Sequence, residues 1–357
     1  MQPAILVTGG AGYIGVHACV ALIEAGYTPL VLDNLCNGSA EALRRIGRIT
    51  GRQPQLIQAD VRDAAALDAL FAAQRIEAVM HFAGLKAVGE STAQPLRYYD
   101  HNVGGSITLL EAMQRAGVRS LIFSSSATVY GEPGVEQFHE DMRCDPVNPY
   151  GRSKWMIEQI LADLAAGEPG WCIARLRYFN PVGAHASGLI GEDPHGVPDN
   201  LMPYITRVAV GRLPELRIFG GDWPTPDGSG VRDYIHVMDL AEGHVAALRH
   251  LLAQPPQLLT LNLGRGRGIS VLELVHAFER ASGRSLPCTM ADRRPGDIAP
   301  PPLRLLGRRH PRRRGAGLAY AARPRCHVPR RLVLATGQPR WLRRLNSDVI
   351  PHGACLI

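Results

Sequence analysis

The sequence predicts an α/β fold with a doubly wound parallel sheet and a smaller α/β lobe attached to it. In residues 1–180, short apolar runs rich in β-branched residues alternate with amphipathic stretches, an order typical of βαβ units. Such units build a parallel sheet with helices on both of its faces. From Pro181 onward Gly, Pro and Asp become dense, which indicates a loop-rich lobe that follows the main sheet.

Each expected element follows from its hydrophobic period and its flanking residues. The strands are short and apolar, and we expect them at residues 5–7, 28–32, 56–58, 78–82, 121–123, 172–179 and 259–263. The helices are amphipathic, and we expect them at residues 15–25, 64–73, 96–116, 153–164, 239–251 and 270–281. The predicted domains are residues 1–180 with returning segments near 232–265, the lobe at 181–299, and a tail at 300–357.

The composition limits the class of protein. The chain has 357 residues, of which 46% are hydrophobic and 20% charged, and no apolar run approaches the ~18 residues of a membrane span. No basic segment precedes the apolar run at Ile5, so we expect no secretory leader. The seven cysteines are scattered and never spaced Cys-x-x-Cys, which argues against a disulfide scaffold and a zinc site. We therefore expect a cytoplasmic protein with reduced thiols, no metal and no membrane segment.

A glycine-rich turn follows the first expected strand. Gly9, Gly12 and Gly15 open the first helix, where glycines allow a tight turn, close approach of a pyrophosphate, and close packing of helix on strand. A lone glycine pattern is a weak indication, but here Asp33 ends the next strand 18 residues after Gly15. An acid at that place accepts ribose hydroxyls and repels a 2′-phosphate. The pattern predicts a Rossmann-type domain that binds NAD rather than NADP.

The lysines of this chain fall in two conspicuous places. Only Lys86 and Lys154 are lysines, against 37 arginines, which indicates that a compact ammonium is wanted at each. Lys154 follows Tyr150 at i+4, so one helix face carries both side chains and the cation favours a phenolate. Ser126 follows the expected strand 121–123, at the sheet edge where such folds hold ligands. Taken singly, each residue is equally compatible with packing or capping, whereas their order favours catalysis.

Several longer sequence blocks carry a family resemblance. They are residues 8–15, 32–36, 81–90, 123–131, 177–185, 191–194, 200–204 and 230–237. Together they resemble the extended short-chain dehydrogenase/reductase family, and within it the UDP-glucose 4-epimerases, from about residue 4 to Asp297. The resemblance implies a tightly held NAD and interconversion of UDP-galactose and UDP-glucose through a 4-keto sugar. It makes Tyr150 the base on the sugar 4-hydroxyl, places Ser126 in its hydrogen-bond path, and has Lys154 tune Tyr150 and hold the nicotinamide ribose.

The resemblance also implies contact residues, position by position. For the cofactor these are Gly9, Gly12, Tyr13, Ile14, Gly15, Asp33, Asn34, Asp60, Val61, Phe82, Ala83, Lys86, Asn102, Tyr150, Lys154 and Tyr178. For the UDP-hexose they are Ser126, Asn180, Asn200, Leu201, Phe219, Arg232, Arg294 and Asp297. Arg suits a pyrophosphate, Phe the face of uracil, and amides its edge. By the same resemblance, helices near 96–116 and 153–164 pair two subunits into a homodimer.

Three interpretations of the function stay open at this point. The leading one is UDP-galactose/UDP-glucose 4-epimerisation. The second is another enzyme of this fold: an epimerase for N-acetylhexosamine nucleotides, a reductase, or a dehydratase. Dehydratases need an acid pair beside the serine, and Ala127-Thr128 stand there instead. The third is a non-catalytic NAD-binding protein whose basic arm binds nucleic acid.

The resemblance stops after Ala299. Residues 300–357 hold thirteen Arg, no Lys and one acid, a charge of +12, so the net charge of +7 leaves −5 for residues 1–299. Pro301 stands where the family has a tyrosine near the sugar, which leaves acceptance of N-acetylated sugars open. The tail fits either a basic arm or out-of-frame translation of an Arg-biased gene, and the abrupt break inside a domain favours the latter. A genuine tail would leave the lobe incomplete, and the chain would bind NAD better than it epimerises.

The frame hypothesis is tested on the coding DNA. Shifting the reading frame near codon 299 is expected to restore an ending with acids and tryptophans in place of the arginine-rich one. Sequencing the gene and translating all three frames checks this, and the absence of such an ending from every frame would contradict it.

Overall fold

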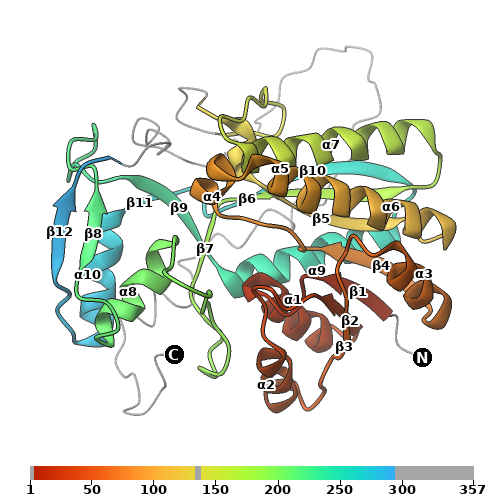
Figure 1. The fold of residues 1–357 in the computed structure, drawn as a ribbon, viewed down its shortest axis with the longest axis horizontal. Coiled ribbons are helices and arrows are strands. Elements are labelled where there is room, and N and C mark those ends of the chain that lie inside the picture. Colours follow the sequence, from red (N-terminus) through yellow and green to blue (C-terminus); the bar gives the residue numbers. More distant parts are fainter. Residues whose placement is uncertain (1–3, 133–137, 294–357) are drawn as a thin grey trace, which may run out of the picture.

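A seven-stranded parallel sheet forms the centre of the molecule. The computed structural model describes residues 4–132 and 138–293, and the strand order is β10-β6-β5-β4-β1-β2-β3 (Figure 1). The strands are β1 (Ala4–Thr8), β2 (Thr28–Asp33), β3 (Gln55–Gln58), β4 (Ile76–His81), β5 (Ser120–Ser126), β6 (Cys172–Tyr178) and β10 (Gln257–Leu263). All neighbouring pairs are parallel. The predicted fold class is confirmed, and the strand order reverses between β1 and β4, where such sheets bind ligands.

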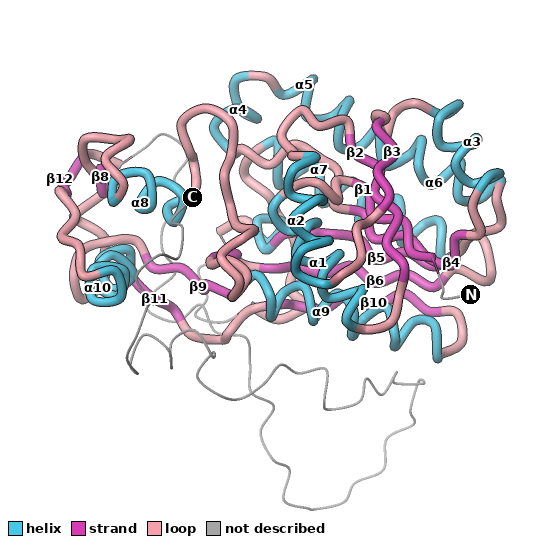
Figure 2. The backbone as a smooth tube through the Cα atoms, turned by 90° about the horizontal axis from the view of Figure 1, so that it is seen from below, coloured by secondary structure: helices cyan, strands magenta, loops and turns pink. Residues whose placement is uncertain are grey.

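Helices cover both faces of this sheet (Figures 1 and 2). On one face lie α1 (Tyr13–Glu24), α2 (Ala40–Thr50) and α9 (Val237–Ala253), and on the other α3 (Ala64–Ala73), α6 (Gly105–Arg115) and α7 (Pro149–Gly167). The side chains of β5 alternate between the two cores: Ile122 belongs to the first, and Leu121 and Phe123 to the second. Each core is thus filled from the sheet and from one helical layer, as strand periodicity requires.

The helix expected at residues 96–116 is interrupted. It consists of α5 (Pro95–Tyr98), a π-helical segment (Tyr99–Gly104) and α6, and is preceded by α4 (Val88–Ala93). Apolar spacing does not reveal a π-turn, because one wide turn shifts the period only locally, yet such turns are frequent at functional sites. This one carries Asn102.

The smaller lobe is built from short strands and two helices. A three-stranded sheet joins β7 (Asn180–Val182), β9 (Val231–His236) and β11 (Gly268–Ser270), and a parallel pair joins β8 (Leu216–Phe219) and β12 (Cys288–Ala291). With α8 (Leu201–Ala209) and α10 (Val271–Ser282), these elements enclose a small core around Ile205, Ile218 and Val275. The predicted α/β lobe is present, while α9 and β10 return to the main sheet. The boundary at residue 180 stays a prediction, and the tail lies outside the described residues.

Polar contacts join the lobe to the carboxyl edge of the main sheet. The Tyr13 hydroxyl donates to the Gly183 carbonyl at 2.7 Å, and the Lys86 ammonium lies 3.0 Å from a Glu192 carboxylate oxygen. Arg45 donates to the Leu189 carbonyl. Among the described residues, no helix combines the length and apolarity that crossing a membrane requires.

Because the central strand is packed on both faces, shortening one of its buried side chains is expected to lower the stability of the fold strongly. Ile122 lies in the central strand β5 and is 0% exposed, so Ile122→Ala is expected to lower the free energy of unfolding by about 2–5 kcal/mol. Val197→Ala is the control, since Val197 is 70% exposed and its loss should change that free energy by less than about 0.5 kcal/mol. Urea denaturation of both variants measures this, and equal effects would contradict it.

Candidate active site

Two of the three glycines in the turn between β1 and α1 are required by the packing of the protein, and the third is not. Gly9 has a φ of +68°, and a Cβ there would lie 2.6 Å from the Ala83 nitrogen. A Cβ on Gly15 would lie 2.4 Å from the Gly9 carbonyl oxygen, so both glycines are required by the packing of the protein itself. A Cβ on Gly12 would meet only that same oxygen, at 3.3 Å. Packing therefore does not explain Gly12, whereas the close approach of a ligand does.

The start of α1 is open to an anion. Gly12 is its N-cap, no side chain caps it, and no acid stands in its first turn, which includes Tyr13 and Ile14. The uncapped N–H groups and the positive end of the helix dipole face the point where the strand order reverses. These features fit a pyrophosphate.

Asp33 ends β2 next to this turn. Its carboxylate is buried and accepts the backbone N–H groups of Ala11 at 3.0 Å and Leu35 at 2.8 Å. Burial raises the pKa of Asp33, and the two N–H donors oppose that shift. Each carboxylate oxygen has a second lone pair, so Asp33 can still accept a pair of ribose hydroxyls. Leu35 is held at a φ of +61°, a sparsely populated conformation typical of functional loops.

A second acid, Asp60, follows the end of β3. Asp60 accepts the Asn34 amide at 2.8 Å, and Arg62 holds the pKa of that carboxyl well below its usual range. Val61 beside it is buried. Asn34, Asp60 and Val61 thus lie together at the carboxyl ends of β2 and β3, as a binding site for the adenosine half of a dinucleotide requires.

The loop after β4 is held by Asn102. Its side-chain oxygen accepts the Leu85 N–H at 2.7 Å, and its amide donates to the Leu85 carbonyl and to the Ser153 hydroxyl, both at 3.0 Å. These bonds tie the loop that carries Phe82 and Ala83 to helix α7. Asn102 was predicted from the sequence to contact the cofactor. In the described structure, its amide is engaged by the protein and positions this loop.

Lys86 lies at the end of the same loop and is bridged to the lobe. Its partner Glu192 also accepts the Asn200 amide, at 2.6 Å. The Glu192 side chain is 7% exposed and that of Lys86 is 46% exposed, so only the carboxylate of this bridge is shielded from water. A predicted cofactor contact, Lys86, and a predicted substrate contact, Asn200, are therefore linked through one carboxylate that sequence reasoning did not single out.

Ser126, Tyr150 and Lys154 come together at the carboxyl ends of β5 and β6. All three are buried, between 5% and 9% exposed. The Lys154 ammonium donates to the Ser124 carbonyl at 2.9 Å and lies 5.0 Å from the centre of the Phe123 ring. Tyr150 hydrogen-bonds with the Ser126 side chain. The predicted catalytic residues thus share one buried site, fixed by the first turns of α7.

The local sequence explains why α7 starts where it does. Pro149 occupies the first turn, and the Asn148 side chain caps the helix by accepting the Gly151 N–H at 2.8 Å. This places Tyr150 in the first turn, where no acid stands and where the helix dipole favours an anion. Burial raises the pKa of Tyr150 and the hydrogen bond with Ser126 lowers it. Burial lowers the pKa of Lys154 to about 8.

The Ser126 hydroxyl is oriented by its neighbour. Its oxygen accepts the Thr128 N–H at 3.2 Å and the Thr128 hydroxyl at 3.0 Å. With its oxygen so occupied, the Ser126 proton is left to be donated. Ala127 stands between them on the short 3₁₀ turn, so no carboxylate lies beside the serine in the sequence.

Aromatic residues form one wall next to these groups. Phe82 packs on His244 with ring centres 4.9 Å apart, and Tyr178 lies 5.9 Å from the same ring. The Tyr178 hydroxyl hydrogen-bonds with Ser124. Burial lowers the pKa of His244 to about 4, so its imidazole is neutral at physiological pH, which suits an apolar wall.

A buried polar chain that sequence reasoning missed supports the site. Ser106 donates to the Asn102 carbonyl at 2.6 Å, so its oxygen accepts His81 Nε2–H at 2.9 Å. His81 Nδ1 then accepts the Thr8 hydroxyl at 2.7 Å, which assigns one neutral tautomer. Burial, followed by the charge of Lys154, lowers the pKa of His81 to about 3. Through Asn102 and Ser153, these hydrogen bonds link the ends of β1 and β4 to α7.

Apart from Ser126, which ends β5, the predicted substrate contacts among the described residues lie on the lobe. Asn180 begins β7, Asn200 is the N-cap of α8, which Leu201 begins, Phe219 ends β8, and Arg232 lies in β9. Both asparagines are exposed, and the other three residues are half-buried. Two further predicted contacts, Arg294 and Asp297, lie outside the described residues.

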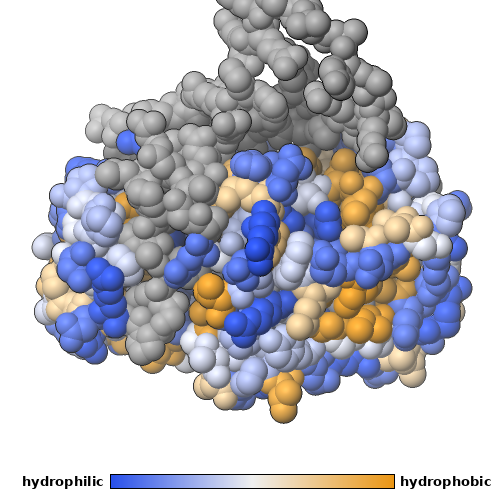
Figure 3. Space-filling model, turned by 90° about the horizontal axis from the view of Figure 1, so that it is seen from above, coloured by the Kyte–Doolittle hydropathy of each residue, from blue (hydrophilic) through white to orange (hydrophobic). Residues whose placement is uncertain are grey.

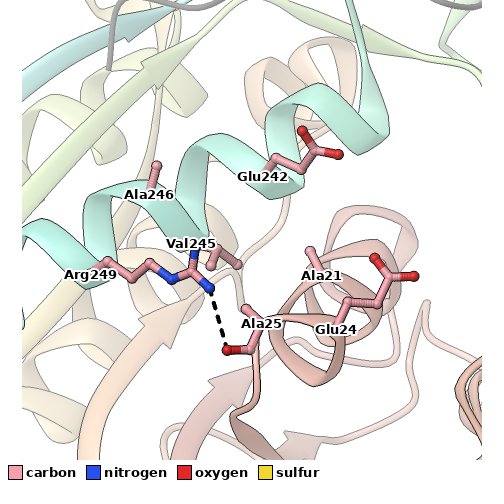
Figure 4. Close-up of a pocket in the computed structure, with 7 residues that line it drawn as sticks. All are labelled: Ala21, Glu24, Ala25, Glu242, Val245, Ala246 and Arg249. Atoms are coloured by element: carbon pink, nitrogen blue, oxygen red, sulfur yellow. Dashed lines mark hydrogen bonds between the residues drawn. The ribbon is translucent and has the colours of Figure 1, made fainter. Parts of the chain in front are cut away.

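A separate groove of about 310 Å³ lies between α1 and α9 (Figure 4). Glu24, Glu242 and Arg249 line it, and Arg249 donates to the Ala25 carbonyl at 3.4 Å. It borders the C-terminal half of α1, whereas the glycine turn lies at the N-terminal end. The groove is therefore distinct from the site around Tyr150.

Comparison with known proteins agrees with this geometry. Residues 5–264 match the model of the NAD dependent epimerase/dehydratase family. A UDP-glucose 4-epimerase of Bacillus subtilis is 58% identical over 296 residues, which cover 83% of this chain and 87% of that protein.

The chain belongs to the NAD-dependent epimerase/dehydratase family. Among solved structures, the UDP-glucose 4-epimerase of Stenotrophomonas maltophila, crystallised with NAD and formylated UDP-arabinopyranose, is 56% identical with a TM-score of 0.81, covering 84% of this chain and 88% of that one. The enzyme of Bifidobacterium longum, in complex with NAD+ and UDP, is 50% identical with a TM-score of 0.80, covering 83% of this chain and 88% of that one. Within the family, the resemblance to UDP-glucose 4-epimerases is confirmed.

The burial of Lys154 predicts a gain in stability when its charge is removed. Its pKa of about 8 lies below the ordinary value of 10.5, so the folded state disfavours the ammonium at pH 7. Lys154→Met is expected to raise the free energy of unfolding there by about 2 kcal/mol, after allowing for the lost bond to Ser124. The gain should fade between pH 8 and 10.5, where the unfolded chain still binds the proton that the folded chain has lost.

Urea denaturation of the unmodified chain and of Lys154→Met, at pH 7 and at pH 10.5, measures the difference in their free energies of unfolding. A gain that stays equal at the two pH values, or a loss at pH 7, would contradict the explanation by burial.

Proposed function

We propose that this chain interconverts UDP-galactose and UDP-glucose by oxidation and reduction at sugar C4 through a 4-keto intermediate. The observation that carries the proposal is the shared buried site of Ser126, Tyr150 and Lys154, at the same sheet edge as an uncapped glycine turn. A base, a proton donor and a cation beside a dinucleotide-binding turn suit reversible removal of hydrogen from an alcohol.

The residues present fit NAD as the cofactor. Gly12 leaves room that packing does not require, and α1 presents uncapped N–H groups to a pyrophosphate. Asp33 has lone pairs for ribose hydroxyls and would repel a 2′-phosphate. When bound, NAD supplies the hydride acceptor and donor and, in its oxidised form, a positive charge. Lys154 is the residue we assign to the nicotinamide ribose.

Tyr150 moves the proton. Burial raises the pKa of Tyr150, and the hydrogen bond with Ser126 opposes that rise. We assign to Lys154, one helical turn further on, and to the first-turn position on α7 the role of favouring the phenolate. Tyr150 accepts the proton of the sugar 4-hydroxyl, and the Ser126 hydroxyl, held by Thr128, donates to the oxygen that carries the developing charge. Return of the proton by Tyr150 completes the second half of the reaction.

The surroundings of Ser126 favour epimerisation over dehydration. Elimination of water needs additional acid and base groups beside the serine, and Ala127 and Thr128 supply neither. The Thr128 hydroxyl instead donates a hydrogen bond to the Ser126 oxygen. The relatives of 56–58% identity reported above are UDP-glucose 4-epimerases, in agreement with this assignment.

We assign UDP recognition to the lobe. We assign Asn180, Asn200 and Leu201, the last two at the start of α8, to the edge of uracil. Phe219 would pack on the face of uracil, and Arg232 would bind the pyrophosphate. The Asn200 side chain does not cap α8, and no acid stands in the first turn of that helix. The α8 N-terminus therefore offers N–H groups to an anion, as the α1 N-terminus does at the glycine turn.

We also propose that two copies associate through α5, α6 and α7. Exposed apolar side chains stand on each of these helices: Leu96 is 81%, Ile107 40% and Met156 45% exposed. Figure 3 looks onto the side where these helices lie and shows apolar patches among hydrophilic ones.

We assign the protein to the cytoplasm, because the five cysteines of the described residues are free thiols.

The function is tested by incubating the purified chain with UDP-galactose and no added NAD. Formation of UDP-glucose is expected, because a retained cofactor needs no regeneration. Tyr150→Phe keeps the ring but removes the base, and should lower kcat by about 10²–10⁴-fold while NAD stays bound. Coupled detection of UDP-glucose, with release of bound nucleotide by denaturation, gives both readouts. Net release of NADH, loss of water, or unimpaired turnover by the variant would each contradict the proposal.

A further inference from the structure

The helix that carries Tyr150 and Lys154 meets the end of β5 at three successive serines. Tyr150 hydrogen-bonds with Ser126, and Lys154 donates to the Ser124 carbonyl at 2.9 Å. The residue between those serines, Ser125, donates to a Glu158 carboxylate oxygen at 2.6 Å. Tyr150, Lys154 and Glu158 are spaced i, i+4 and i+8 along α7 and share one face of it. Glu158 thus makes the third contact in a series whose other two belong to the reaction.

The Glu158 carboxylate is fully buried and fully paired. It is 0% exposed, and Arg177 of β6 donates to it from Nε at 2.9 Å and from Nη2 at 2.6 Å. Arg177 is 4% exposed at its side chain and is fixed in turn by donating to the Tyr130 hydroxyl and the Glu140 carbonyl, both at 3.1 Å. Tyr130 ends the 3₁₀ turn that begins directly after Ser126. The pair therefore holds α7, β5, β6 and that turn together.

Stability alone does not account for this arrangement. Apolar residues of similar volume often replace a buried ion pair without loss of stability, and the best-attested use of such pairs is to fix register. Ile157 and Leu161 already pack α7 against this face of the sheet. Apolar contacts tolerate sliding, whereas a bidentate carboxylate–guanidinium pair with a serine on its third side does not.

We propose that Glu158 is a positioning residue, which with Ser125 and Arg177 fixes the register of α7 against β5 and so the approach of the Tyr150 hydroxyl to Ser126. The inference rests on the proposed epimerisation. Proton transfer requires hydrogen-bond distances, and a misplacement of about 1 Å costs about a hundredfold in rate. A shift of α7 along the strand would move Tyr150 together with Lys154, whereas the groups assigned to the pyrophosphate and to UDP stand on α1 and on the lobe. The expected consequence is a loss in kcat with little change in KM or in NAD retention.

Ser125→Ala is the first test, because it removes one hydroxyl and leaves the ion pair intact. We expect kcat to fall about tenfold, with KM for UDP-galactose within about twofold and NAD retained. Glu168→Gln is the matched control: Glu168 caps the C-terminal end of the same helix and pairs with Arg119 at 3.1 Å, but its side chain is 35% exposed. The control should match the unmodified chain in kcat and KM.

A charge-balanced variant, Glu158→Met with Arg177→Met, separates position from stability. It should retain the melting temperature to within a few degrees and lose kcat more than Ser125→Ala does. An unchanged kcat in Ser125→Ala, an equal fall in Glu168→Gln, or a loss of NAD together with raised KM would overturn the proposal. The unmodified chain is assayed in parallel. If it is active, any of these contrary results rejects only the positioning role of Glu158. If it is inactive, the proposed epimerisation and the positioning role are both rejected.

Discussion

The burial of the Lys154 ammonium against the Ser124 carbonyl is the interaction on which the arrangement of the site depends. Taking an ammonium out of water is costly, and the lowered pKa of Lys154 records that cost. The position is held because Asn148 fixes the start of α7 and Ile157 binds its apolar face to the sheet. Water exclusion strengthens every electrostatic interaction at this place, so the burial that destabilises the fold would also strengthen the effect that we propose for Lys154 on Tyr150.

Hydrogen bonds extend this constraint to the cofactor side. Thr8 ends β1 just before the glycine turn, His81 ends β4, and Asn102 connects the following loop to Ser153 on α7. Neutral His81 suits this role, since a second buried cation next to Lys154 would be unfavourable. The glycine turn and the helix that carries Tyr150 are therefore joined by one buried polar network, although they lie far apart in sequence. A buried network has all of its hydrogen bonds only in one arrangement of its side chains. It therefore holds the ends of β1 and β4 in a fixed position relative to α7.

Much of this was predictable where the sequence pattern is regular. The six expected strands of residues 1–180 correspond to β1–β6, and the helix expected at 64–73 is observed with those bounds. Helix α2 was missed although Leu43 and Ile46 are spaced for burial and Gly51 ends it in a left-handed conformation. The π-turn at Asn102 was not predictable, because a single wide turn leaves the apolar period intact on either side. Glu158 was overlooked, although its i+4 spacing from Lys154 was visible.

The sequence by itself determined the parallel α/β fold and the glycine turn with its acid, and it predicted Ser126, Tyr150 and Lys154 as the catalytic residues. Such features are local: they depend on residue type and on spacing within one strand or helix turn. Only the tertiary structure decided which groups face one another across elements. It showed that Asn102 is engaged by the protein, that Glu192 bridges Lys86 to Asn200, and that Arg177 pairs with Glu158. These contacts join residues distant in sequence, and their partners are set by how helices pack on the sheet, which no local pattern encodes.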